Sequence, residues 1–171
     1  NLSVKRDGHI KRNEVRPLIT DLDELPFPDR EVYYRRYKLI RESPLKPFMA
    51  SRGCPFSCSF CFNEKLRAIY SNKGEYVRFY TPGYLIKQIK DVEFRYGLKT
   101  AYFMDDLFVS DQGWVREFTD MYKKEVRKPF VCSANINTLN EESIKLLKEA
   151  GCHAVSFGIE TGNEKLRQEL L

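Results

Sequence analysis

The chain has 171 residues, of which 42% are hydrophobic and 31% are charged, and its formal net charge is +5. This composition is typical of a globular domain with a sizeable core, and it excludes the disordered and fibrous classes. No apolar run approaches the roughly 20 residues that cross a bilayer, and no signal-peptide pattern opens the chain. We therefore expect a cytoplasmic protein with no membrane span.

The first 44 residues predict a lead-in to a larger domain. Residues 1–15 hold two short runs on either side of Asp7-Gly8, which predicts a β-hairpin. Residues 16–30 contain three prolines and predict an extended connector. Tyrosines alternate with basic side chains in residues 33–41. This pattern is compatible with nucleic-acid binding, or with a helix whose basic face is solvated and whose tyrosines are buried. We favour the helix and expect no nucleic-acid partner.

Residues 45–171 predict an α/β domain with a parallel sheet. Four short apolar runs predict its strands, at residues 47–51, 100–104, 130–134 and 154–159. A polar N-cap residue predicts the start of each intervening helix, at Thr81, Asp111 and Asn140. Strands separated by helices of this length imply parallel pairing through βα crossovers.

The loop after the first predicted strand carries the chemistry. Cys54, Cys58 and Cys61 follow one another in the spacing C-x3-C-x2-C. Soft thiolates bind zinc or an iron–sulfur cluster, but the usual patterns for both supply four ligands, and this stretch supplies three. A cubane held by three cysteines keeps one iron open to a substrate or cofactor. The alternatives are buried structural cysteines, or a zinc site with a distant fourth ligand, for which neither His9 nor His153 has a convincing spacing.

With Phe60 at the aromatic place, this motif resembles the C-x3-C-x-aromatic-C signature of the radical S-adenosylmethionine (radical SAM) enzymes. The resemblance implies a parallel partial (β/α)6 barrel, here truncated after about four strands. It also implies a four-iron, four-sulfur (4Fe-4S) cluster that chelates SAM and reduces it to a 5′-deoxyadenosyl radical. The partners that it implies are a small-molecule substrate and an electron donor such as flavodoxin or ferredoxin.

Polar residues stand where the predicted strands end, which is where α/β folds build their sites. The candidates for cofactor binding, besides Phe60, are Asp105, Asp106, Ser133 and Glu160. The resemblance implies that Glu160 holds the SAM ribose, on a strand whose residues 156, 158 and 160 share one face and where Gly158 leaves room for the cofactor. Asp105 has three open roles: contact with the SAM amino group, contact with a substrate, or a carboxylate near the following helix.

Two further cysteines, Cys132 and Cys152, raise the question of a second cluster. Each is a single cysteine, one on an apolar strand and one beside a helix-ending glycine. Such residues usually behave as small buried hydrophobes, which is the expectation here.

Two details predict that the chain is a piece of a longer protein. Residue 1 is Asn, and the final segment starts like a capped helix at Asn163 but has no stop signal. The proline-rich connector resembles the segment that leads from a cobalamin-binding domain into the barrel of many radical SAM proteins. This implies cobalamin bound outside the chain and methyl transfer, cyclisation or rearrangement of an unknown substrate. The alternatives are a tRNA methylthiotransferase-like enzyme and a zinc-stabilised binding module without enzymatic activity.

Overall fold

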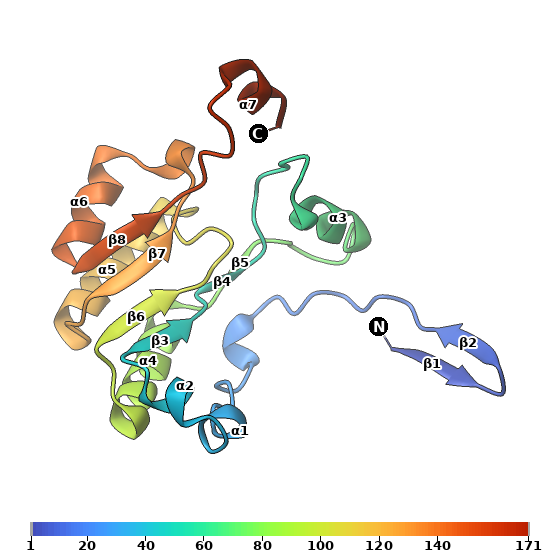
Figure 1. The fold of residues 1–171 in the computed structure, drawn as a ribbon, viewed down its shortest axis with the longest axis horizontal. Coiled ribbons are helices and arrows are strands. Elements are labelled where there is room, and N and C mark those ends of the chain that lie inside the picture. The colour runs from blue at the N-terminus through green and yellow to red at the C-terminus, as the bar shows by residue number, and fades with distance from the viewer. Residues whose placement is uncertain (1, 171) are drawn as a thin grey trace.

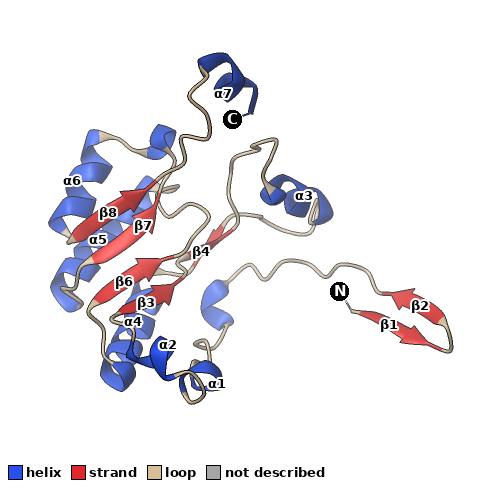
Figure 2. Ribbon diagram, viewed as in Figure 1, coloured by secondary structure: helices blue, strands red, loops and turns tan. Residues whose placement is uncertain are grey.

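A sheet of four parallel strands forms the centre of the computed structural model, which describes residues 2–170 (Figure 1). In spatial order the strands are β3 (Leu45–Phe48), β6 (Thr100–Phe103), β7 (Phe130–Ser133) and β8 (Cys152–Ser156). One face of the sheet is covered by helices, which are α4 (Pro82–Tyr96), α5 (Gln112–Glu125) and α6 (Glu141–Glu149) (Figure 2). The predicted α/β fold with four parallel strands is confirmed.

The three helices begin at the predicted N-caps. The side chain of Thr81 accepts a hydrogen bond from the backbone of Tyr84, and that of Asp111 accepts one from Trp114. Asn140 forms a capping box with Ser143. Each cap gives a partner to a backbone N–H group that the helix itself cannot satisfy.

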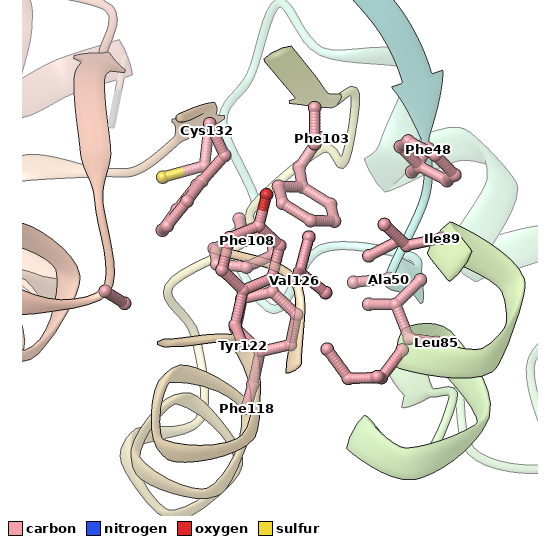
Figure 3. Close-up of a cluster of buried hydrophobic side chains, with 14 of the residues drawn as sticks. Phe48, Ala50, Leu85, Ile89, Phe103, Phe108, Phe118, Tyr122, Val126 and Cys132 are labelled. Carbon is pink, nitrogen blue, oxygen red and sulfur yellow. The ribbon is translucent and has the colours of Figure 1, made fainter. Parts of the chain in front are cut away.

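Aromatic rings fill the space between the sheet and the helices. Phe103, which is fully buried at the end of β6, packs its ring centroid 4.7 Å from that of Phe108, 5.3 Å from Phe118 and 5.7 Å from Phe130 (Figure 3). Met104, which directly follows β6, is 52% exposed. The packed core therefore lies between the sheet and the helices.

The first predicted strand, at residues 47–51, is in fact two pieces. β3 ends at Phe48, and the chain then turns into β4 (Ser51–Arg52), which pairs antiparallel with β5 (Arg78–Phe79). The cause is the carboxylate of Asp105, which takes the backbone N–H groups of residues 50 and 51 out of the parallel ladder.

The fourth predicted strand, at residues 154–159, lies earlier than expected. β8 ends at Ser156, because its partner β7 ends at Ser133 and the backbone bond from Ala134 to Ser156 is the last between the two segments. Helix α7 (Glu164–Leu170) follows. Its start is capped by Asn163, as predicted.

The lead-in begins with the predicted hairpin, β1 (Ser3–Arg6) and β2 (His9–Arg12), which projects away from the sheet (Figure 1). Asp7 and Gly8 both have positive φ, of 49° and 79°, as a two-residue hairpin turn requires. The remaining short elements are a 3-10 turn, η1 (Leu22–Glu24), and two helical turns, α1 (Glu31–Tyr34) and α2 (Lys38–Glu42).

The expectation of buried tyrosines in this lead-in is wrong for two of the three. Tyr34 is buried, but Tyr33 is 59% and Tyr37 is 51% exposed. The segment forms two short helices instead of one long helix, so it presents no continuous face to the domain. No helix within residues 2–170 is both long and apolar enough to cross a membrane.

Candidate functional site

The three cysteines of the motif lie in a loop between β4 and helix α3 (Phe62–Ile69), an element that the sequence analysis did not predict. The backbone N–H of Cys61 donates to the carbonyl of Cys58 over 2.9 Å, which folds the second half of the loop into a tight turn. Cys61 then directly precedes the helix. Cys54, Cys58 and Cys61 are half-buried thiols.

Arginine from α3 holds the first half of the loop. The guanidinium of Arg67 donates to the carbonyl of Pro55 over 3.2 Å and to that of Phe56. Both acceptors lie between the first and second cysteines. The helix that follows the motif therefore fixes the backbone within it.

Gly53 allows the chain to enter the loop. Its φ of +84° lies in the left-handed region, and a Cβ atom there would stand 2.4 Å from the carbonyl oxygen of Tyr76. Only glycine tolerates both the conformation and the close approach. The start of the cysteine loop is thus pressed against the segment that leads into β5.

Asp105 anchors the base of the loop from the end of β6. Its carboxylate is buried and accepts hydrogen bonds from the backbone N–H groups of Ala50 at 2.9 Å and Ser51 at 2.5 Å, and from the Ser51 hydroxyl at 2.6 Å. Burial raises the pKa of Asp105, and these hydrogen bonds act in the opposite direction. The Ser133 hydroxyl donates a hydrogen bond to the backbone carbonyl of Asp105 over 2.6 Å.

A cavity of about 750 Å³ opens between the cysteine loop and the carboxyl ends of the strands. Its volume lies within the range of about 300–1,000 Å³ that small-molecule sites have. The wall comes from the cysteine loop and α3 on one side, from the segments after β6, β7 and β8, and from α7. The site is therefore assembled from four separate stretches of the chain.

The structure brings together most of the residues predicted from the sequence. The cavity lining includes the three cysteines together with Phe60, Asp106 and Glu160. Asp105 and Ser133 are not part of this lining, and both are engaged in bonds that hold the rim together. The sequence analysis missed Asn63, a buried side chain of α3 that also lines the cavity.

The predicted setting of Glu160 needs a correction. Residues 158 and 160 do not share a strand face with Ser156, because β8 ends at Ser156 and Glu160 has a φ of +64°. The space beside Gly158 is also occupied, since a Cβ there would stand 2.0 Å from Oε1 of Glu160. The carboxylate of Glu160 folds back over Gly158 at the edge of the cavity.

The pKa of the Cys54 thiol is raised because the side chain is partly buried. Besides burial, the negative charge of Asp106 raises this pKa, while a backbone hydrogen bond from Phe56 lowers it. Without a metal, Cys54 therefore retains its proton more strongly than an exposed thiol does. A positively charged metal would reverse this preference.

The donor set fits an iron–sulfur cluster. Within residues 2–170, no three His, Cys, Asp or Glu side chains lie close enough to share one metal ion. Each cysteine of a cubane binds a different iron, so the three sulfurs surround a group larger than a single ion. Three thiols on one loop, facing one roomy cavity, match that requirement.

Cys132 and Cys152 lie outside this cavity lining. Cys132 belongs to the buried core, as predicted (Figure 3). Cys152 is half-buried and packs against this core. Their sulfur atoms are 4.0 Å apart across β7 and β8. The two residues are therefore neighbours of each other, away from the three-cysteine loop.

Comparison with known proteins agrees with this geometry. The chain is 31% identical over 166 residues to the uncharacterized methyltransferase PH0819 of Pyrococcus horikoshii, which covers 96% of this chain and 35% of that protein. It is 26% identical to the cytidylyl-2-hydroxyethylphosphonate methyltransferase of Streptomyces wedmorensis, over 88% of this chain and 29% of the relative. It is 27% identical to the hopanoid C-3 methylase of Methylococcus capsulatus, over 90% of this chain and 30% of that relative. The chain thus spans about a third of each relative.

A solved structure has the same fold. The radical S-adenosylmethionine methyltransferase TsrM of Kitasatospora setae, with tryptophan substrate and a SAM analogue bound, superposes with a TM-score of 0.62 at 17% identity. The match covers 75% of this chain and 24% of TsrM. The TsrM structure with cobalamin and a 4Fe-4S cluster bound gives the same TM-score, identity and coverage of this chain, and the match covers 25% of that TsrM chain. A model of the Radical SAM superfamily matches residues 49–170. The chain therefore belongs to the radical SAM superfamily.

Proposed function

We propose that the protein of which this chain forms part is a radical SAM methyltransferase. The observation that carries the proposal is that three cysteines from one loop share a cavity with Asp106 and Glu160 at the carboxyl end of a parallel sheet. The three relatives described above are named as methyltransferases or a methylase, which supports methyl transfer. The substrate that we propose is a small molecule of unknown identity.

The cysteines would hold three corners of a 4Fe-4S cluster and leave one iron free for SAM. The chemistry that a bound cluster supplies is a single electron, with which SAM is cleaved to methionine and a 5′-deoxyadenosyl radical. In this proposal Glu160 accepts hydrogen bonds from the ribose hydroxyls of SAM, and Asp106 accepts them from its amino group; both residues line the cavity. The exposed ring of Phe60 offers an apolar surface to the adenine.

Asp105 and Ser133 have a supporting role in this proposal. Asp105 fixes the backbone at the base of the cysteine loop, and Ser133 binds the backbone carbonyl of Asp105. We therefore assign them to the positioning of the loop and not to direct contact with the cofactor.

The parts of the proposal that concern the whole protein rest on the relatives and on the sequence resemblance. We propose that residues 1–44 lead in from a further N-terminal domain that binds cobalamin, as the cobalamin-bound TsrM structure suggests by analogy. We also propose an electron donor of the flavodoxin or ferredoxin kind. A cytoplasmic location would suit the three thiolates, which need a reducing compartment.

Anaerobic reconstitution of the full-length protein with iron and sulfide tests the cluster. We expect about four irons per chain, as a cubane requires, and loss of the cluster when Cys54, Cys58 or Cys61 is changed to Ala. Cys132→Ala is the matched control and should retain the iron. Zinc without iron in the purified protein, or retention of the cluster in Cys58→Ala, would contradict the proposal.

The products formed from SAM test the reaction. Methyl transfer leaves S-adenosylhomocysteine, whereas reductive cleavage leaves 5′-deoxyadenosine and methionine. With a reductant and cobalamin present, we expect both sets of products from the wild type and neither from Cys58→Ala. A wild-type protein that holds four irons and forms no S-adenosylhomocysteine would exclude methyl transfer under these conditions.

A further inference from the structure

Asn63 is a buried polar side chain in direct contact with one of the three cysteines. It lies in the first turn of α3, two residues after Cys61, and is 4% exposed. Its Nδ2 atom donates a hydrogen bond to the sulfur of Cys61 over 3.8 Å. A buried amide directed at a thiol is uncommon enough to need an explanation, because burial without good partners is costly.

Tyr76 holds the other end of the Asn63 amide. Its hydroxyl donates to Oδ1 of Asn63 over 2.7 Å. In the opposite orientation of the amide, Oδ1 would face the sulfur of Cys61, and an oxygen lone pair would meet a thiolate. A tyrosine hydroxyl can donate or accept, so it is the charge of a ligating thiolate that selects the orientation in which Asn63 offers an N–H group to the sulfur. The Tyr76 hydroxyl then donates to Oδ1 and holds the amide in that orientation.

Tyr76 is itself well fixed. Its carbonyl oxygen lies against Gly53 at the start of the cysteine loop, and its ring lies under the guanidinium of Arg67, whose carbon is 6.0 Å from the ring centroid. Burial and then the charge of Asp106 raise the pKa of Tyr76, so its hydroxyl keeps the proton that it donates. The Tyr76–Asn63 pair thus bridges the two ends of the loop.

A hydrogen bond to a ligating sulfur affects the two redox states of a cluster differently. The reduced cluster carries one more negative charge than the oxidised cluster, so an N–H donor at the sulfur stabilises it more. Hydrogen bonds to the sulfurs are among the factors that set the reduction potential of iron–sulfur clusters. Removing such a donor lowers the potential.

We propose that Asn63, oriented by Tyr76, is a redox-tuning residue that raises the reduction potential of the cluster by donating a hydrogen bond to Cys61. This inference rests on the proposed function, since it assumes a cluster at the three cysteines. It assigns a role to a residue of α3 that is not part of the cysteine motif. The same bond orients the Cys61 side chain toward the cavity.

The test is a redox titration of the reconstituted full-length protein, followed by the electron paramagnetic resonance signal of the reduced cluster, without SAM. In Asn63→Leu, which has a similar size and no donor, we expect the equilibrium constant for one-electron reduction to fall by up to about tenfold, or ~59 mV. Asn13→Leu is the control, because Asn13 is an exposed asparagine that lies outside the cavity lining. Its potential should equal that of the wild type.

Tyr76→Phe is a second variant for the same titration, and it provides the test if Asn63→Leu does not bind a cluster. This variant removes only the hydroxyl, and we expect a smaller shift in the same direction. Equal potentials in the wild type, Asn63→Leu and Tyr76→Phe, with about four irons in each, would overturn the tuning role and leave the proposed function intact. Absence of iron from the wild-type protein would instead overturn the proposed function.

Discussion

Asp105 offers the sharpest test of how the cysteine loop is held. Oδ1 of its carboxylate accepts three hydrogen bonds, from the backbone N–H groups of Ala50 and Ser51 and from the Ser51 hydroxyl, whereas Oδ2 accepts only a longer bond of 3.1 Å from Ala50. Asp105→Ala removes all four and leaves two buried amides without a partner. The serine hydroxyl can rotate to another acceptor, but the amides cannot.

The expected cost follows from these contacts. An unsatisfied buried donor costs about 1–3 kcal/mol, and the loss of a desolvated carboxylate offsets part of this, so we expect Asp105→Ala to lower the free energy of unfolding by about 2–4 kcal/mol. Asp105→Asn can keep its oxygen at the Oδ1 position and so retain three of the four bonds. For this variant we expect about 1–2 kcal/mol.

Urea unfolding of the apo proteins under anaerobic, reducing conditions measures these differences. Asp106→Ala is the matched control, because Asp106 is the next residue but is exposed, and its change should stay within about 0.5 kcal/mol. We also expect a lower iron content after reconstitution in Asp105→Ala than in the control. If Asp105→Ala and Asp106→Ala unfold at the same urea concentration, the anchoring role is wrong.

The dependence on pH gives a second check on Asp105. Burial raises its pKa in the folded state above the ordinary value of 3.8, so the folded protein binds this proton more tightly than the unfolded chain does. Stability from this source is present at low pH and is lost as the pH rises through the folded-state pKa. The stability advantage of the wild type over Asp105→Asn, which does not titrate, should therefore shrink as the pH rises above about 4 and through the folded-state pKa. An advantage that grows over this range would contradict the assignment.

Three further changes test the site and the sheet. Glu160→Ala should leave the iron content unchanged and weaken SAM binding in a calorimetric titration by about 1–3 kcal/mol, or roughly 5- to 150-fold; equal affinity would remove Glu160 from the cofactor site. Gly53→Ala should prevent assembly of the cluster, because its Cβ would meet the Tyr76 carbonyl at 2.4 Å; a normal iron content would contradict this. The isolated 171-residue chain should associate through the open edge of β8, whereas a monomer in size-exclusion chromatography would not fit this expectation.

The sequence predicted those parts of the fold that depend on neighbouring residues. Thr81, Asp111 and Asn140 each begin a helix because a cap needs only a polar side chain within the first turn. The Asp7-Gly8 turn is equally local. The parallel pairing of the strands was predicted from the lengths of the helices between them.

Contacts between distant segments could not be predicted in this way. Asp105 lies 55 residues from Ala50, and its carboxylate breaks a strand that the apolar pattern alone predicts as continuous. Asn63 and Tyr76 meet only because α3 and the segment before β5 pack together, and nothing in either stretch signals the other. Side chains alternate between the two faces only within a strand. The prediction that Glu160 shares a face with Ser156 failed because β8 ends at Ser156, four residues earlier.

The cysteine loop has a further consequence for how the protein acquires its cofactor. Residues 53–77 leave and rejoin the domain through the short ladder between β4 and β5, so they form a side branch that is tied to the parallel sheet at its base, where Asp105 binds Ser51. Segments of this kind open locally at a lower free energy than a packed core does. We expect the strands and helices to fold first and the branch to stay accessible until iron and sulfide arrive. Assembly of the proposed cluster would then be a late, local ordering event on a sheet that has already folded.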